Sequence, residues 1–164
     1  MRRCCLLMAA TGLALLSGCS VLRPQPEPGL NRRLASRGDD RSPSLARDGL
    51  AWIAPAPSGS GQLQVRWLEF RSGLVTPLPG LNRPDARPIS VSSDARGQRF
   101  ALVRSLDGRT ELLLYDRPLR VLRPLPLLPA GVPARVALSA DGRSLAVQVS
   151  RQGRWQVDVL PLPN

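Results

Sequence analysis

Short apolar runs, separated by turns that contain glycine or proline, follow one another from about Ser42 to the last residues of the chain. Runs of four to eight residues between such turns predict antiparallel strands joined by tight hairpins. In the middle of the chain the predicted strands lie roughly at residues 89–92, 100–105, 111–116 and 120–124.

The same arrangement occurs before and after this middle unit. Gly97 and Gly142 are 45 residues apart, and Pro77 and Pro124 are 47 residues apart. A period of this length with four short strands per unit is typical of propeller blades. We therefore predict an all-β fold of about three four-stranded antiparallel blade-like repeats forming a partial β-propeller, with the last blade incomplete. The remaining predicted strands lie at residues 50–54, 63–70, 74–78, 136–138, 145–150 and 155–160.

One turn and the strand after it carry a family resemblance. Ser139-Ala140-Asp141-Gly142-Arg143-Ser144-Leu145-Ala146-Val147 resembles the repeat signature of TolB-type propellers, and Asp107-Gly108 followed by Leu112-Leu113-Leu114-Tyr115-Asp116 is similar to the next strand of that repeat. The resemblance covers about residues 42–164. It implies blades, and a role either in envelope scaffolds or in gating a peptidase. Ala140 stands where the family has proline, and Ala95-Arg96 is expected to lengthen the middle turn.

Three blades are too few for a closed ring, because each sheet buries both faces against neighbours. We expect apolar positions such as Trp52, Leu63 and Val157 to be exposed on the terminal sheets. Three outcomes are open at this point: an open stack of sheets, a sandwich-like collapse, and a homodimer that completes a six-bladed ring.

The first residues resemble a bacterial lipoprotein signal peptide. Arg2 and Arg3 precede an apolar stretch too short to span a membrane, and Leu16-Ser17-Gly18-Cys19 matches the lipobox. The resemblance implies removal of residues 1–18 and lipid attachment at Cys19. Ser20 after that cysteine implies sorting to the outer membrane, facing the periplasm.

Residues 19–41 are rich in proline and charge and lack an apolar period, which predicts a flexible tether behind the lipidated cysteine. An N-terminal strand within residues 30–41 that pairs with the domain is the alternative. The propeller domain is predicted over residues 42–164.

The side-chain chemistry speaks against catalysis. All 23 basic residues are arginine, so the chain lacks a histidine or lysine base. Asp48, Asp94, Asp107 and Asp141 lie in turns, where aspartate bonds the local backbone. Without Cys or His ligands in the mature chain we predict no metal site, and without a glycine-rich phosphate loop no cofactor. The sequence predicts a protein that is not an enzyme.

The formal net charge of +11 suits anionic partners. The arginines are spread along the repeats, which favours a solvated surface over a single binding run. We predict a cell-envelope lipoprotein that binds or scaffolds envelope proteins and does not bind nucleic acid. The alternatives are a charge-driven binder of lipopolysaccharide, anionic lipid or phosphate polymers, and a non-catalytic remnant of a hydrolase-associated propeller. Trp52, Trp67 and Trp155 are expected in packing between blades.

Overall fold

The computed structural model describes residues 24–35 and 38–163, and the chain divides into two units, residues 1–34 and residues 35–164. In the described part of the first unit, helix α1 runs from Pro28 to Leu34. The second unit contains all of the described strands. The predicted signal peptide and Cys19 lie outside the described residues.

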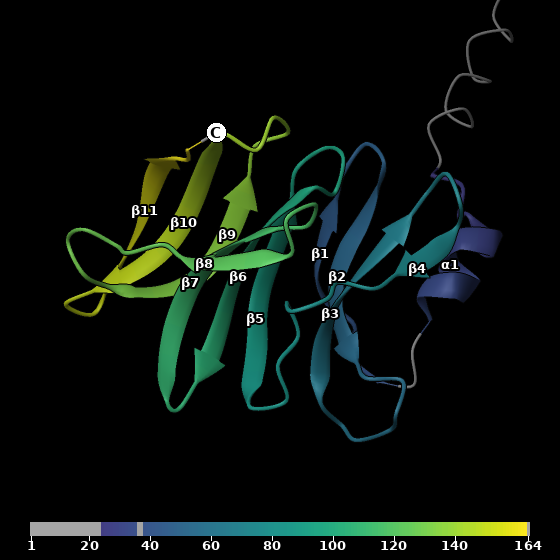
Figure 1. The fold of residues 1–164 in the computed structure, drawn as a ribbon, viewed down its shortest axis with the longest axis horizontal. Coiled ribbons are helices and arrows are strands. Elements are labelled where there is room, and N and C mark those ends of the chain that lie inside the picture. The colour runs from purple at the N-terminus through teal and green to yellow at the C-terminus, as the bar shows by residue number, and fades with distance from the viewer. Residues whose placement is uncertain (1–23, 36–37, 164) are drawn as a thin grey trace, which may run out of the picture. The chain divides into compact units, whose positions relative to one another are not determined.

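Eleven strands in the described residues form three antiparallel sheets, and sequence neighbours pair within each sheet. In Figure 1 the second sheet lies between the first and the third. The first sheet contains β1 (Arg41–Leu45), β2 (Gly49–Pro55), β3 (Leu63–Glu69) and β4 (Leu74–Thr76). The second contains β5 (Ala86–Ser93), β6 (Arg99–Leu106), β7 (Arg109–Asp116) and β8 (Val121–Pro124). The third contains β9 (Val132–Leu138), β10 (Ser144–Arg151) and β11 (Arg154–Pro161).

The prediction of a partial propeller with an incomplete last blade is confirmed, and the sheets form the open stack. The question left open for residues 30–41 is also answered in part. Residues 30–34 of that region lie in helix α1, and Arg41 begins β1, which pairs with β2 in the first sheet. The strand pattern missed β1 because Arg41-Ser42-Pro43-Ser44 alternates serine with charge and proline instead of apolar residues.

Aromatic side chains fill the core between the first and second sheets. Trp67 of β3 is fully buried and meets the ring of Phe100 edge-on, with 5.5 Å between centroids and an interplanar angle of 86°. Phe100 in turn contacts Tyr115, whose hydroxyl donates a hydrogen bond to the Pro79 carbonyl oxygen at 2.7 Å. Such edge contacts stabilise a core beyond the area that they bury.

The core between the second and third sheets is aliphatic. Leu112 and Leu114 of β7 pack against Leu145 and Val147 of β10, and all four are buried. Leu162, which follows β11, completes this cluster. Alternate residues of β6 and β7 face opposite cores, as the two-residue period of a strand requires.

A ladder of serines joins the inner strands of neighbouring sheets. Ser44 of β1 accepts the N–H of Ser93 at 3.2 Å, and Ser92 of β5 accepts the N–H of Leu138 at 2.8 Å. Ser42 and Ser90 make the corresponding bonds one step along the strands. These hydroxyls satisfy backbone N–H groups at the inner edge, where a sheet would otherwise leave them unpaired.

The hairpins of the second and third sheets are the same length, so the prediction of a longer middle turn is wrong. Asp94 stands where the third sheet has Ser139. Asp94 accepts the N–H groups of Gln98 and Arg99, and Ser139 accepts the two that correspond to them.

The outer face of the third sheet is exposed. Val157 and Val159 of β11 are each 69% exposed, as expected for a terminal sheet. Trp155 is 60% exposed, so its predicted role in packing between blades is wrong. Trp52 of β2 is buried, contrary to the expectation of an exposed position, and Leu63 is half-buried.

Candidate functional site

A groove of about 660 Å³ runs along the three inner strands, because the open stack does not wrap them into a closed channel. Each inner strand contributes one stretch of its wall. The lining residues are Arg41, Ser42, Pro43 and Ser44 of β1, Ile89, Ser90, Val91 and Ser92 of β5, and Ala134, Arg135, Val136 and Ala137 of β9. We call this the inner groove.

The inner groove is electropositive, since its lining contains two arginines and no carboxylate. Arg41 forms an ion pair with Asp39, N to O 3.1 Å, on the exposed surface. Arg135 is exposed, and its side chain makes no hydrogen bond or ion pair among the described residues. A guanidinium of this kind presents a planar set of donors that suits a carboxylate or a phosphate.

Two serine hydroxyls of the groove retain an unused donor. Ser92 accepts hydrogen bonds from the N–H of Leu138 and from the hydroxyl of Ser44, at 2.8 and 3.3 Å. Ser90 accepts in the same way, from Val136 and Ser42. A hydroxyl that accepts two bonds still has one proton to donate. These protons are therefore available to a ligand in the groove.

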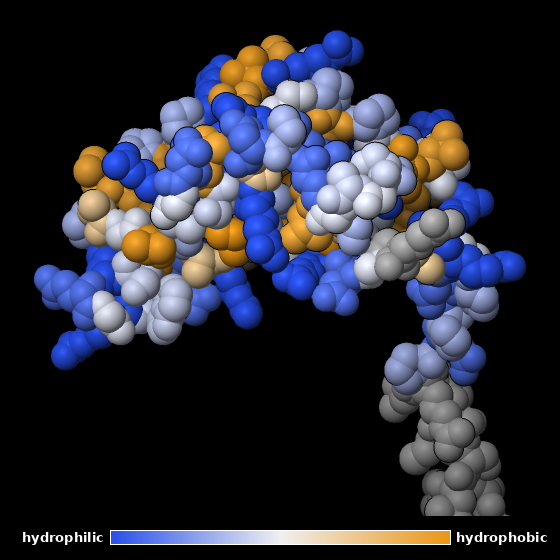
Figure 2. Space-filling view, turned by 90° about the horizontal axis from the view of Figure 1, so that it is seen from below, coloured by the Kyte–Doolittle hydropathy of each residue, from blue (hydrophilic) through white to orange (hydrophobic). Residues whose placement is uncertain are grey.

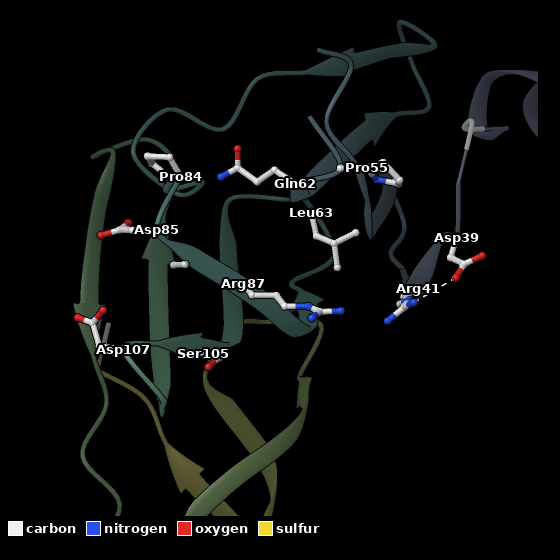
Figure 3. A pocket seen from close by; sticks show the side chains of 12 residues that line it. Asp39, Arg41, Pro55, Gln62, Leu63, Pro84, Asp85, Arg87, Ser105 and Asp107 are labelled. Carbon is white, nitrogen blue, oxygen red and sulfur yellow. Dashed lines mark hydrogen bonds and ion pairs between the residues drawn. The ribbon is translucent and has the colours of Figure 1, made fainter. Parts of the chain in front are cut away.

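A second cavity of about 560 Å³, the end cleft, adjoins the groove at Arg41 (Figure 3). Figure 3 shows the Arg87 side chain reaching across it from β5, toward Leu63 and Arg41. Arg87 also makes no hydrogen bond or ion pair among the described residues, and it is exposed. Three guanidinium groups, on β1, β5 and β9, thus line two connected cavities.

Two carboxylates of the end cleft, Asp85 and Asp39, are bound to arginines. Asp85 binds Arg83 through two hydrogen bonds, of 2.9 and 2.6 Å. That bonding holds the pKa of the Asp85 carboxyl below its usual value. A general acid would need a raised pKa. Asp39 is likewise bonded to Arg41.

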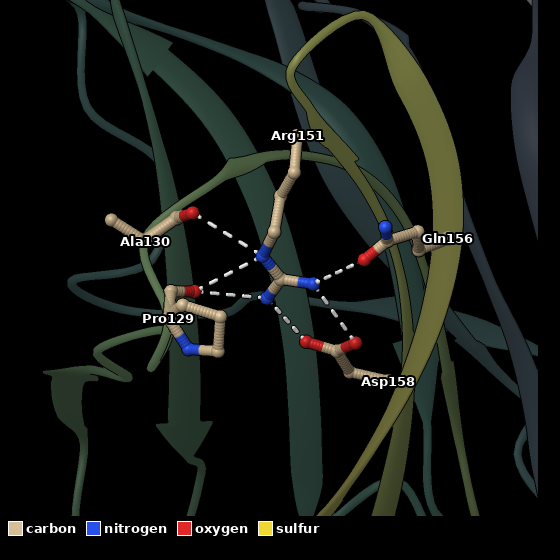
Figure 4. A network of polar contacts seen from close by, with 5 residues as sticks. All are labelled: Pro129, Ala130, Arg151, Gln156 and Asp158. Carbon is tan, nitrogen blue, oxygen red and sulfur yellow. Dashed lines mark hydrogen bonds and ion pairs between the residues drawn. The ribbon is translucent and has the colours of Figure 1, made fainter.

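Arg151 builds a structural network on the third sheet (Figure 4). Its guanidinium binds both carboxylate oxygens of Asp158 at 3.1 and 2.5 Å and the Gln156 side chain at 3.1 Å. It also donates to the carbonyl oxygens of Pro129 and Ala130, which ties the loop before β9 to the sheet. The Arg151 guanidinium lowers the pKa of Asp158. With its donors used in this way, Arg151 is unsuited to ligand binding.

The turn aspartates lie where the sequence predicts. Asp94 bonds the backbone of its own hairpin, and Asp141 accepts hydrogen bonds from the Ser139 hydroxyl and the Arg143 N–H. These bonds lower the pKa of Asp141. Within residues 24–35 and 38–163, no group of three or more Cys, His, Asp or Glu residues could hold a metal ion. Helices long and apolar enough to span a bilayer are also missing from this part of the chain.

Comparison with known proteins was informative at the level of structure only. The chain matches no family model and no curated protein sequence. Its structure is similar to TolB from Acinetobacter baumannii, with a TM-score of 0.63 and 16% identity over 80% of this chain and 32% of that chain. The fold is a TolB-like partial propeller. The chain thus spans about a third of the TolB chain, and at this identity the likeness concerns the fold alone.

A second similar structure is the β-propeller domain of Myceliophteria thermophila Cps50 (Swd1). Its TM-score is 0.43, with 15% identity over 77% of this chain and 40% of that chain.

Sequence reasoning did not find the groove of this TolB-like fold. Arg41 lies in the predicted tether, and Arg87 and Arg135 lie in separate repeats, so no local run marks them. Figure 2 shows hydrophilic side chains spread between small hydrophobic patches on the face in view, as the scattered arginines predicted. The one signal available was the serine alternation, Ser42-x-Ser44 repeated as Ser90-x-Ser92.

Proposed function

We propose that this chain is a non-catalytic binding module, and that its inner groove takes an extended acidic segment of a partner protein. The observation that carries this proposal is the carboxylate-free lining, with the unpaired guanidinium of Arg135 and the free hydroxyl protons of Ser90 and Ser92. An extended peptide presents carbonyl and carboxylate acceptors at regular intervals. The groove supplies matching donors on a rigid scaffold of strands.

The proposal includes a place for the module. The N-terminal sequence supports removal of residues 1–18 and lipid attachment at Cys19, which would anchor the module to the outer membrane and face it toward the periplasm. Envelope proteins are then the partners within reach. A homodimer that completes a six-bladed ring would close the stack, and Val157 and Val159 on the exposed outer face of the third sheet offer it an apolar surface.

A second candidate function is supported by the charge. The same three guanidiniums would bind phosphate groups of lipopolysaccharide or of phosphate polymers. Binding of that kind weakens as salt is added, and so does binding of an acidic segment to the same guanidiniums. The two functions are therefore separated by the partner that binds, a protein segment or a vesicle containing lipopolysaccharide.

The inner groove and the end cleft are tested together by replacing the unpaired guanidinium that lines each of them, Arg135→Glu and Arg87→Glu. The control is Arg71→Glu with Arg109→Glu, because these two arginines are also exposed and unpaired among the described residues but lie outside both cavities. Chemical crosslinking in intact envelopes, followed by purification, compares both pairs with the wild type. Cys19→Ala serves as the unanchored variant.

We expect wild type and control pair to capture the same partner, and the groove pair to lose it. Equal capture by the two pairs would refute a role for the groove. Vesicles containing lipopolysaccharide provide the second arm. Salt-sensitive binding to them that falls equally in both pairs would favour the general charge-driven function instead.

A further inference from the structure

β11 is a long edge strand without protection against pairing. It pairs with β10 through eight consecutive residue pairs, and among the described residues nothing pairs with its other side. The other sheet edges are protected. β4 and β8 are three and four residues long, and β1, β5 and β9 each contain a proline and a break in pairing register. Short edges, prolines and bulges prevent association between edges, and β11 has only Pro161 at its end.

Alternate residues of β11 present their backbone groups to the free edge. Leu162, directly after β11, donates its N–H to the Arg143 carbonyl oxygen at 2.8 Å. Because hydrogen bonding in an antiparallel pair alternates from residue to residue, the even-numbered residues of β11 bond β10. The N–H and C=O groups of Trp155, Val157 and Val159 therefore point away from the sheet. Their side chains are 60%, 69% and 69% exposed on its outer face.

The strand is complementary to itself in one antiparallel register. With Val157 opposite Val157 of a second copy, Trp155 lies opposite Val159 and Val159 opposite Trp155, all on one face. Cross-strand pairs of aromatic and β-branched residues stabilise a sheet. The register also uses the whole free stretch, because it ends where Gly153 of one copy meets Pro161 of the other, which has no N–H to donate.

The side chains on the inner face match in the same register. Gln156 lies opposite Asp158 of the second copy, and Arg154 lies opposite Leu160. The Gln156 Oε1 atom accepts a hydrogen bond from Arg151 at 3.1 Å, so its amide N–H groups are left to bond that carboxylate. A register shifted by two residues would place the two Asp158 side chains opposite each other, where like charges repel. The shift in the other direction shortens the paired stretch.

A second copy on the outer face, added as the next blade, has less support than one at the edge. Ser90 and Ser92 of β5 accept backbone N–H groups of β9, which joins the second sheet to the third. The positions of β9 that correspond to these serines hold Arg135 and Ala137, whose side chains do not accept hydrogen bonds. A next blade would therefore lack the hydrogen bonds that join the three sheets of this chain.

We propose that β11 pairs with β11 of a second copy, antiparallel and about a two-fold axis beside Val157. The two three-stranded sheets then form one continuous sheet across the dimer. The inner grooves of both copies stay open, because they are lined by β1, β5 and β9. The dimer goes beyond the proposed function and does not depend on it.

Disulfide trapping tests the register directly. In the full chain with Cys4→Ser, Cys5→Ser and Cys19→Ala, Val157→Cys places one cysteine of each copy opposite the other. Cα atoms of opposite residues are about 4.5–5.5 Å apart, which a disulfide spans. Val159→Cys is the matched control, because Val159 is equally exposed on the same strand. Its counterpart in the second copy lies about 13 Å further along the strand.

We expect Val157→Cys to form a covalent dimer at least tenfold faster than Val159→Cys, as measured on a non-reducing gel. A mixture of Trp155→Cys and Val159→Cys chains should also crosslink, and mass spectrometry should find the 155–159 link between copies. Equal oxidation of Val157→Cys and Val159→Cys would overturn the register. The absence of a crosslink would overturn the proposal.

Light scattering over a range of concentrations tests the dimer without new cysteines. In the full chain with Cys19→Ala, Val157→Pro removes the N–H at the centre of the edge but none that bonds β10. Ala146→Glu is the control, because it places a charge on the outer face in β10, away from the edge. We expect the dissociation constant to rise at least tenfold in Val157→Pro and to stay unchanged in Ala146→Glu. A dimer lost only in Ala146→Glu would show packing between faces and would overturn the proposal, as would a monomer at every concentration.

Hydrogen exchange, resolved by residue, identifies what covers the edge. We expect the amides of Trp155, Val157 and Val159 to exchange at least tenfold more slowly in the dimer than in the monomer, and those of Gln156 and Asp158 to change little. Equal protection of the three odd-numbered amides in the monomer would show that another segment of the same chain covers β11. That outcome would overturn pairing between copies.

Discussion

Gly97→Ala is expected to disrupt the contact between the first and second sheets. Gly97 has a φ of 63°, in the left-handed region that disfavours a side chain. A Cβ atom there would lie within 2.7 Å of three ring atoms of Trp67. The ring cannot move aside easily, because it is fully buried and packed edge-on against Phe100. Gly108→Ala is the matched control: its φ is 73°, and nothing lies within 4 Å of the added Cβ.

The structure separates the two costs. A side chain at positive φ destabilises by about 1–2 kcal/mol, which applies to both variants. Overpacking against a rigid core adds about 1–3 kcal/mol, which applies to Gly97→Ala alone. The free energy of unfolding of Gly97→Ala should therefore be about 2 kcal/mol lower than that of the control Gly108→Ala. For a domain of this size that corresponds to a Tm about 6 °C lower.

Urea unfolding measures this difference, followed by the fluorescence of the tryptophans and repeated by far-ultraviolet circular dichroism. Coincident transitions would establish two-state unfolding and allow the free energies to be compared. If Gly97→Ala is no less stable than Gly108→Ala, Trp67 does not hold the hairpin of the second sheet in the way described.

Three further outcomes follow from single contacts. Ser92→Ala should lower the free energy of unfolding by about 1–3 kcal/mol, because the N–H of Leu138 in β9 loses its acceptor. The control Ser105→Ala should change it little. Chemical denaturation of both variants measures the difference. Tyr115→Phe should lower the free energy of unfolding by about 1 kcal/mol, because the hydrogen bond to the Pro79 carbonyl oxygen is lost. Burial raises the pKa of the wild-type phenol, so an absorbance titration should show Tyr115 ionising at higher pH than an exposed tyrosine. The Arg151 guanidinium lowers the pKa of Asp158, so this pair stabilises the fold above the ordinary carboxyl pKa and is lost as pH falls through the lowered value. The stability difference between wild type and Asp158→Asn should accordingly shrink as pH is lowered from about 6 to about 3, and a constant difference would refute the pairing.

The sequence by itself determined the strands and their repeat. Alternating apolar residues and Asp-Gly turns act within a few residues, so the hairpins around Gly108 and Gly142 could be located from local chemistry alone. The same local signals did not give the length of the middle turn, because aspartate and serine perform the same bonding in a turn and Asp94 stands where the third sheet has Ser139. β1 escaped detection because its stability comes from serine hydrogen bonds to β5, which no apolar period records.

Only the tertiary structure decided which sheet faces are covered and which side chains come together in the inner groove. Trp52 and Trp155 both lie in strand patterns, yet one is buried and the other is 60% exposed, since burial depends on tertiary neighbours and not on the strand itself. The inner groove likewise joins Arg41 and Arg135, which are far apart in sequence, because stacking places β1, β5 and β9 side by side. Local propensity sets the period of each strand, but contacts between distant segments set the site.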